Sequence, residues 1–176
     1  MTNTHAAFTG SIPEIYDAHL GPFLFEFSAK DLADRVKDRI PPDGKILEVA
    51  CGTGISTYHL RQTLPSSVHI TATDLNSAML DFAKDKHADL PGVTFEVADA
   101  LSLIFDDHAF DAVICQFGIM FFPDKNKGLA EMARMLKPWV VGARYPTSRG
   151  LYHASAPETL SGMPVSQTST ARSAAF

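Results

Sequence analysis

Apolar and polar residues follow each other along the chain in a pattern that predicts alternating strands and helices. Four short, mostly apolar runs predict strands, the first of them buried: KILEVA at 45–50, VHITATD at 68–74, VTFEVAD at 93–99 and FDAVICQF at 110–117. A fifth run, WVVGARY at 139–145, has the same character. Because helical patterns separate these runs, we expect a doubly wound α/β fold with a parallel sheet. A ligand would lie at the carboxyl ends of the strands, where the strand order reverses.

Four helices are expected, the first of which begins at Ser28, a suitable N-cap, and ends at the sequence PPDG. The second is ISTYHLRQTL, and Asn76 can cap the third, SAMLDFAKDKH. Pro123 suits the first turn of the fourth helix. The buried stripe of that helix would consist of Leu129, Met132, Ala133 and Leu136. Residues 1–27, rich in Phe, Gly and Pro, are expected to be irregular or to form short helices.

Composition places the chain among ordinary globular proteins. Of its 176 residues, 45% are hydrophobic and 20% are charged, with a net charge of −5 at pH 7. This negative balance argues against nucleic acid or an anionic membrane as a partner, because surfaces that bind them are normally basic. We see no secretory signal and no run that would span a membrane, so we expect a cytoplasmic protein. The 2 cysteines and 7 histidines show no metal-ligand spacing, which predicts reduced thiols and no bound metal.

The stretch LEVACGTGIST at 47–57 carries the most specific local signal. Gly52 and Gly54 stand where the first strand passes into a helix, and glycine lets the backbone turn tightly and approach a ligand. The following helix offers free N–H groups and the positive end of its dipole, which suit a carboxylate or a phosphate. Taken alone, the same two glycines also fit a turn that serves only packing.

Three successive strands place an acid at or near their carboxyl ends, namely Glu48, Asp74 and Asp99. Crowded acids cost free energy unless a ligand binds them, so they indicate a binding rim. Asp74 stands 20 residues after Gly54, as in a dinucleotide fold, but a dinucleotide fingerprint needs a third glycine where this chain has Thr57. An acidic rim without Lys or Arg suits a cationic ligand better than a pyrophosphate.

Four motifs in order resemble those of class I S-adenosylmethionine (SAM)-dependent methyltransferases: LEVACGTGIST, TATDLNSAML, VTFEVADAL and FDAVICQFGIMFFPDKNKGLAEMARMLKP. The resemblance covers about residues 8–138 and is greatest to the small-molecule branch similar to ubiquinone/menaquinone-biosynthesis C-methyltransferases. It implies a Rossmann-like sheet, SAM as cofactor and a small-molecule methyl acceptor. The chain departs from the family motif at Ala50, where relatives often have the first glycine.

The resemblance also implies which residues hold the methionine part of the cofactor. Glu48 would orient the methionine amino group, Gln116 would contact the methionine end, and Tyr16 would close the pocket from the lead segment. The residues of the turn would let the cofactor lie on the backbone: Ala50, Cys51, Gly52 and Gly54. A strand-end acid paired with a lysine is the alternative for Glu48.

For the adenosine part, the resemblance assigns Asp74 to both ribose hydroxyls and Leu75 to packing on the adenine. Asp99 would accept from the adenine amino group, and the backbone of Ala100 would face a ring nitrogen. A helix cap or a solvated acid is the alternative for Asp74, and the sequence around Asp99 is less distinctive.

The acceptor side of the site is less defined. An aromatic and methionine cluster either lines an acceptor pocket or, as is more common, belongs to the core: Phe117, Met120, Phe121 and Phe122. Methyl transfer from a sulfonium is an in-line displacement, for which a protein mainly supplies alignment and exclusion of water. No catalytic base is indicated, since His19 and His59 are candidates by residue type alone.

The resemblance ends after ARMLKP. Relatives continue with a glycine turn and further strands, whereas this chain reads WVVGARYPTSRG and then becomes rich in Ser, Thr and Ala. We expect a methyltransferase domain at 1–145, incomplete at its C-terminus, and a poorly ordered tail at 146–176. Truncation or a change of reading frame near Trp139 would explain this, and the exposed sheet edge would then invite a homodimer.

Two other functions stay open at this point. A non-catalytic SAM-binding fragment is consistent with the unusual C-terminal sequence. A NAD(P)-dependent oxidoreductase is consistent with the glycine turn and with Asp74, although Thr57 argues against it.

Overall fold

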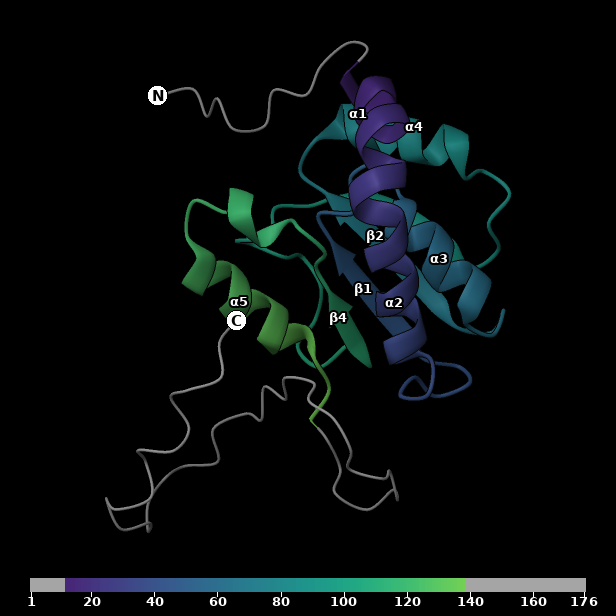
Figure 1. Ribbon diagram of the computed structural model, residues 1–176. Helices are drawn as coiled ribbons and strands as arrows, with labels where there is room; N and C mark the ends of the chain where they lie inside the picture. The colour runs from purple at the N-terminus through teal and green to yellow at the C-terminus, as the bar shows by residue number, and fades with distance from the viewer. Residues whose placement is uncertain (1–11, 139–176) are drawn as a thin grey trace, which may run out of the picture. The chain divides into compact units, whose positions relative to one another are not determined.

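A sheet of four parallel strands lies at the centre of this computed structural model, which describes residues 12–138 (Figure 1). The strands are β1 (Lys45–Val49), β2 (His69–Asp74), β3 (Val93–Val97) and β4 (Ala112–Ile114). Their order is β3-β2-β1-β4, so the chain steps outward from β1 to β3 and then returns to the other side of β1. This α/β architecture confirms the predicted fold class. The order reverses between β1 and β4, where a ligand site is expected.

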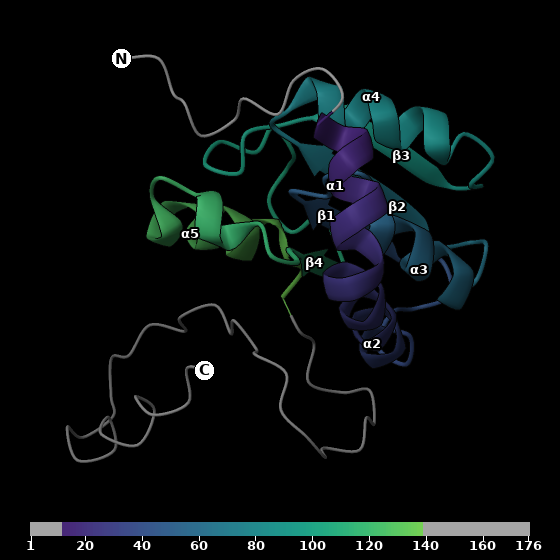
Figure 2. The ribbon, with the colours of Figure 1, turned by 45° about the horizontal axis from the view of Figure 1, so that its top comes forward.

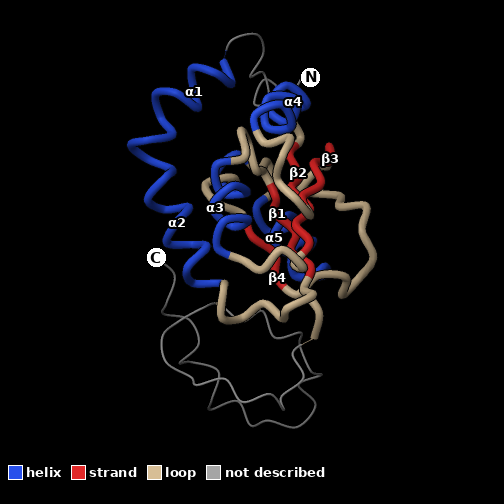
Figure 3. The backbone as a smooth tube through the Cα atoms, turned by 90° about the vertical axis from the view of Figure 1, so that its right-hand side faces the viewer, coloured by secondary structure: helices blue, strands red, loops and turns tan. Residues whose placement is uncertain are grey.

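Helices cover both faces of the sheet. They are α1 (Ile12–Leu20), α2 (Glu26–Val36), α3 (Ile55–Thr63), α4 (Ser77–Lys86) and α5 (Lys125–Met135). A π-helical turn, η2 (Gly21–Phe25), joins α1 to α2, and a 3₁₀ turn, η3 (Ile119–Phe121), precedes α5. Figures 1 and 2 show α5 on one side of the strands and α2 and α3 on the other. In Figure 3, α1 and α2 follow one another along the edge of the molecule.

Side chains alternate between the two faces of the sheet along each strand, and this divides the core into two parts. On one face, Ile46 of β1 and Ile70 of β2 pack with Ala33 of α2 and Leu60 of α3. On the other face, the next residue of β1, Leu47, packs in a cluster with Phe110, Phe122 and Met135. Successive side chains of a strand point to opposite faces, so β1 anchors both halves of the fold and fixes the position of the turn that follows it.

The lead segment differs from the prediction. Residues 12–25 form α1 and the π turn, which agrees with the short-helical alternative. However, α2 begins at Glu26 and continues from that turn, so Ser28 lies inside a helix and the prediction that it caps one is wrong. The helical signal of 12–25 is weak in the sequence because Gly21 and Pro22 interrupt it.

Two predictions for α5 are also wrong. Asp124 is the N-cap, accepting a hydrogen bond from the Lys127 N–H at 3.0 Å, so Pro123 precedes the helix. Of the predicted buried stripe, Met132 packs against the core, whereas Leu129 is 46% exposed and Ala133 is exposed. The fully buried residues of the helix are Gly128 and Met135. The apolar pattern misleads because the helix packs against Phe122 through a glycine, Gly128.

The predicted N-cap of α4, Asn76, is confirmed. The side chain of Asn76 accepts hydrogen bonds from the N–H groups of Ala78 at 2.9 Å and Met79 at 3.2 Å. The predicted fifth strand at 139–145 and the predicted tail at 146–176 lie outside the described residues.

Candidate functional site

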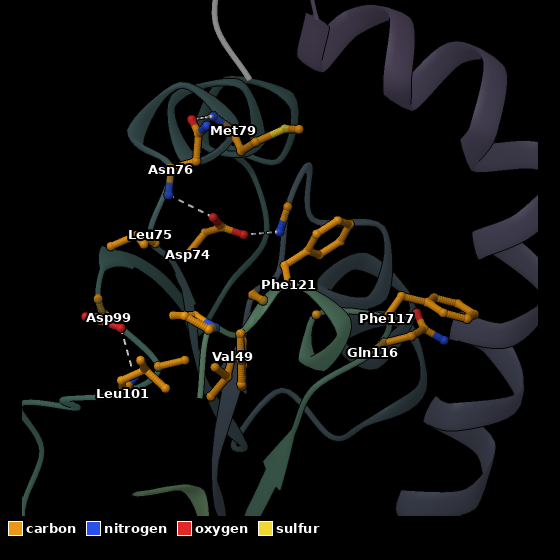
Figure 4. A pocket seen from close by; sticks show the side chains of 17 residues that line it. Val49, Asp74, Leu75, Asn76, Met79, Asp99, Leu101, Gln116, Phe117 and Phe121 are labelled. Carbon is orange, nitrogen blue, oxygen red and sulfur yellow. Dashed lines mark hydrogen bonds between the residues drawn. The ribbon is translucent and has the colours of Figure 1, made fainter. Parts of the chain in front are cut away.

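A cavity of about 280 Å³ opens at the carboxyl ends of the strands (Figure 4). The residues that follow each strand contribute to it in turn: Ala50 and Gly52 after β1, Leu75 and Asn76 after β2, Asp99 and Ala100 after β3, Gln116 and Phe117 after β4. All four strand ends meet at this point because the sheet is parallel. The cavity therefore lies where the strand order predicts a ligand site.

The turn after β1 is built from left-handed backbone conformations. Ala50 has φ 58°, Gly52 has φ 57° and Gly54 has φ 81°. At Gly54, which is the N-cap of α3, an added Cβ would lie 2.7 Å from Cδ2 of His87, so both the backbone and the space require glycine. Ala50 adopts the conformation that a glycine would take without strain, and this is how the chain accommodates its departure from the family motif.

Glu48 lies beneath the turn and lines neither this cavity nor the smaller one next to it. Its side chain is 1% exposed and accepts hydrogen bonds from the hydroxyls of Ser56 and of Thr57, the latter at 2.6 Å. Burial raises the pKa of Glu48 to about 7, although the two hydroxyls oppose the rise. The side chain of Thr57, which stands where a dinucleotide fingerprint has glycine, is thus committed to this acid.

Asp74 connects the turn to the end of β2. One carboxylate oxygen accepts from the Gly52 N–H at 2.9 Å and the other accepts from the Asn76 N–H at 2.8 Å (Figure 4). Burial raises the pKa of Asp74, and these backbone hydrogen bonds oppose the rise. Each oxygen can accept a further hydrogen bond, so the carboxylate can hold the turn and a ligand hydroxyl at once.

The end of β3 forms another wall of the cavity. Asp99 is exposed, and one of its oxygens accepts from the Leu101 N–H at 2.8 Å. Ala100 is buried beside it, and Leu75 is 50% exposed. These residues combine an apolar surface with a carboxylate, which suits a flat heterocycle with an amino group.

A second cavity, of about 40 Å³, adjoins the first and shares Ala50, Gly52 and Gln116 with it. Its other lining residues are Phe25, Cys51, Thr53, Ile55 and Ser56. Ile55 and Ser56 belong to the first turn of α3, whose N–H groups favour an anion. The buried hydroxyl of Thr53 has no hydrogen-bond partner among the described residues.

Acids are the charged side chains of this site. Among the described residues that line the two cavities, Asp74 and Asp99 are charged, and none is Lys, Arg or His. Cysteine chemistry is disfavoured, because burial raises the pKa of Cys51 and raises that of Cys115 to about 11. At neutral pH both thiols are therefore protonated.

The structure brings together most of the residues singled out from the sequence. Gln116 lines both cavities and Cys51 lines the second, whereas the side chain of Tyr16 lies outside the described residues. Residues that the sequence did not assign to the cofactor also line the first cavity: Val49, Asn76, Met79, Ala98 and Leu101. The signal in the sequence would have been their positions close after or beside the ends of the first three strands.

The aromatic cluster after β4 divides between the two predicted roles. Three of its members line the first cavity: Phe117, Phe121 and Phe122. Phe122 is at the same time buried in the core, and Met120 is 58% exposed without lining either cavity.

Residues 12–138 contain neither a membrane-spanning helix nor a cluster of metal ligands. In this part of the chain, no helix combines the length and the apolar character needed to cross a membrane. Within the same residues, no group of three or more His, Cys, Asp and Glu side chains is placed to hold a metal ion.

Comparison with known families agrees with this geometry. A family model described as a methyltransferase domain matches residues 46–139, which is 94 of the 176 residues. This chain belongs to the class I SAM-dependent methyltransferases. The matched region of this methyltransferase domain contains the glycine turn, Asp74, Asp99 and Gln116. The family resemblance seen in the sequence is thereby confirmed.

The domain is also similar in sequence to curated methyltransferases. It is 38% identical over 98 residues to the ubiquinone/menaquinone biosynthesis C-methyltransferase UbiE of Geobacter sulfurreducens, covering 54% of this chain and 38% of that protein. It is 43% identical over 95 residues to the demethylmenaquinone methyltransferase of Deinococcus radiodurans, covering 53% of this chain and 39% of that protein. The chain thus spans about two fifths of the length of these relatives.

Solved structures share the fold. A protein from Methanococcus maripaludis matches with a TM-score of 0.67 and 19% identity, over 78% of this chain and 64% of that chain. The SAM-bound amino pentose methyltransferase CalS10 of Micromonospora echinaspora matches with a TM-score of 0.58 and 29% identity, over 70% of this chain and 52% of that chain.

Proposed function

We propose that this chain binds SAM along the two adjoining cavities and transfers its methyl group to a small-molecule acceptor. The observation that carries the proposal is the charge of the site: among the described residues, its only charged lining groups are Asp74 and Asp99. SAM carries a sulfonium and an ammonium group, both positive, and a single carboxylate. An acid-lined site, with the N-terminus of α3 at the second cavity, matches this distribution of charge.

The adenosine part of SAM fits the first cavity. The Asp74 carboxylate, already fixed by two backbone N–H groups, would accept from both ribose hydroxyls. Leu75 would pack on the adenine, Asp99 would accept from its amino group, and the backbone of Ala100 would face a ring nitrogen.

The methionine part fits the second cavity. The first turn of α3 would bind the carboxylate, and the buried hydroxyl of Thr53 would gain the partner that it lacks among the described residues. Glu48 beneath the turn would favour the ammonium group when its carboxylate is ionised, and Gln116 would contact the same end of the molecule. Ala50, Cys51, Gly52 and Gly54 would form the floor. We retain the assignment of Tyr16 as a closing residue only as a sequence-based proposal.

Methyl transfer requires little chemistry from the protein. A nucleophilic atom of the acceptor forms a bond to the methyl carbon while the bond from that carbon to sulfur breaks, and SAM leaves as neutral S-adenosylhomocysteine. The residues around the boundary of the two cavities would align the acceptor and exclude water. We assign no general base: besides the two acids, the titratable side chain that lines the described site is Cys51, and burial raises the pKa of its thiol.

A dinucleotide fits the site less well. The pyrophosphate of NAD(P) would meet two carboxylates and no lysine or arginine among the described lining residues. Thr57, buried and bonded to Glu48, occupies the position of the third fingerprint glycine. A small-molecule acceptor is supported by the names of the curated relatives and by the net charge of −5, which disfavours nucleic acid.

Titration calorimetry with S-adenosylhomocysteine and with NADH tests the cofactor. We expect saturable binding of S-adenosylhomocysteine and none of NADH, and the reverse result would overturn the proposal. Transfer of a labelled methyl group from SAM to a panel of phenols, amines and carbon acids then tests turnover. Binding without transfer to any of them would favour a SAM-binding domain that does not catalyse the reaction.

A further inference from the structure

Two aromatic side chains meet at the boundary between the two cavities. The ring centroids of Phe25 and Phe117 are 5.3 Å apart and their planes are inclined by 64°, an edge-to-face contact. Phe117 lines the first cavity, Phe25 lines the second, and Gln116 lines both. Figure 4 shows Phe117 and Gln116 side by side, next to the purple helical lead segment. A ligand that fills both cavities would lie against Gln116, which directly precedes Phe117 and lines both of them.

Phe117 has an uncommon backbone conformation, and Phe25 lies at the end of an uncommon helical turn. Phe117 has φ 58°, a left-handed conformation that costs a bulky residue free energy and persists only where the surroundings enforce it. Phe25 ends the π-helical turn η2, a rare element that is frequent at functional sites. This turn is anchored on the start of α3, since an added Cβ on Gly21 would lie 3.2 Å from Cδ1 of Ile55.

An acid, Asp74, lines the first cavity together with Gln116 and Phe117. Burial raises the pKa of Cys115, which directly precedes Gln116, and the charges of Glu48 and Asp74 add to the rise. The influence of both acids therefore reaches the end of β4. If adenosine occupies the first cavity and methionine the second, the sulfonium that joins them lies at the boundary. Aromatic faces attract cations electrostatically, and the attraction is lost when the cation becomes neutral.

We propose that Phe25 and Phe117 form an aromatic wall that recognises the sulfonium and makes the site prefer SAM to S-adenosylhomocysteine. The inference rests on the proposed function, because it assumes that one SAM molecule spans both cavities. The two phenylalanines are then specificity-determining residues for the cofactor. Methyl transfer removes the positive charge from sulfur, so the same wall would favour exchange of the product for fresh SAM.

The test is the ratio of the dissociation constants for S-adenosylhomocysteine and SAM, measured by calorimetry on the full chain. Phe25→Leu and Phe117→Leu should each lower the preference for SAM about three- to thirty-fold while S-adenosylhomocysteine affinity changes less than about two-fold. Phe27→Leu is the matched control, because Phe27 is 82% exposed and lines neither cavity, and it should leave the ratio unchanged. Phe117→Tyr keeps the ring and should keep the preference.

Three outcomes distinguish the explanations. An unchanged ratio in both leucine variants overturns the aromatic wall, and so does an equal loss of affinity for the two ligands, which would indicate packing alone. If Phe117→Leu does not fold, the ratios of the two dissociation constants in Phe25→Leu and Phe117→Tyr decide whether the aromatic wall stands. Failure of the unmodified chain to bind either ligand overturns the proposed function itself.

Discussion

Replacing Glu48 with glutamine should make the protein more stable above neutral pH, because the buried carboxylate costs free energy that an amide of the same shape does not. The Glu48 side chain is 1% exposed, and burial raises its pKa from 4.5 to about 7. The folded state therefore favours the protonated form, whereas the unfolded chain ionises at the ordinary pKa. The hydroxyls of Ser56 and Thr57 can rotate to serve an amide as donors or acceptors.

The magnitude follows from the pKa. One pKa unit corresponds to about 1.4 kcal/mol, so a rise from 4.5 to about 7 corresponds to about 3 kcal/mol. Because the pKa of Glu48 is raised in the folded state, its favourable contribution to the free energy of unfolding is complete below pH 4.5. That contribution is lost as the pH rises through 7. The variant and the unmodified protein should thus have similar free energies of unfolding at pH 4.5. The variant should be more stable by about 3 kcal/mol at pH 8.

Urea denaturation followed by circular dichroism between pH 4.5 and pH 8 measures this difference. Glu96→Gln makes the same chemical change on the exposed side of β3 and should alter the free energy of unfolding by less than about 0.5 kcal/mol at every pH. A difference between Glu48→Gln and the unmodified protein that does not grow with pH would refute the reasoning. So would a variant that is less stable at pH 8.

Three further substitutions have defined outcomes. Asp74→Ala should weaken S-adenosylhomocysteine binding by about 1–3 kcal/mol, since a charged hydrogen bond is lost, and unchanged affinity in calorimetry would remove its ribose role. Asn76→Ala should lower the free energy of unfolding in urea by about 1 kcal/mol, because two N–H groups of α4 lose their cap, and an unaltered midpoint would contradict this. Gly118→Ala should cost about 1–3 kcal/mol, because the new Cβ would lie 2.4 Å from Cβ of Ala50. Adding Ala50→Gly should restore part of that loss, whereas additive effects in the double-mutant cycle would argue against the contact.

The sequence predicted the features that depend on local chemistry. The strands β1 and β2 are visible because residues buried on both faces form continuous apolar runs. The cap at Asn76 follows from a side chain that can reach the next N–H groups. The turn at Gly52 and Gly54 was visible because left-handed backbone strongly favours glycine. Together with the order of the strands, these features were enough to locate the cavity.

Features that depend on contacts between distant segments were not predictable. Helix α5 packs through Gly128, where a Cβ would lie 2.5 Å from Cδ2 of Phe122, and an apolar pattern cannot reveal a contact made by a missing side chain. Glu48 belongs to the acidic cluster in sequence, but it points into the face covered by α3 and meets Ser56 and Thr57 there. The pairing of Phe25 with Phe117 joins segments 92 residues apart and depends on the π turn.

A crystal structure of the chain with S-adenosylhomocysteine bound tests the central claim most directly. We predict that both ribose hydroxyls donate to the Asp74 carboxylate, that the adenine lies between Leu75 and Ala100, and that the methionine carboxylate lies at the first turn of α3. Adenosine bound away from Asp74, or a ligand confined to one of the two cavities, would contradict the claim.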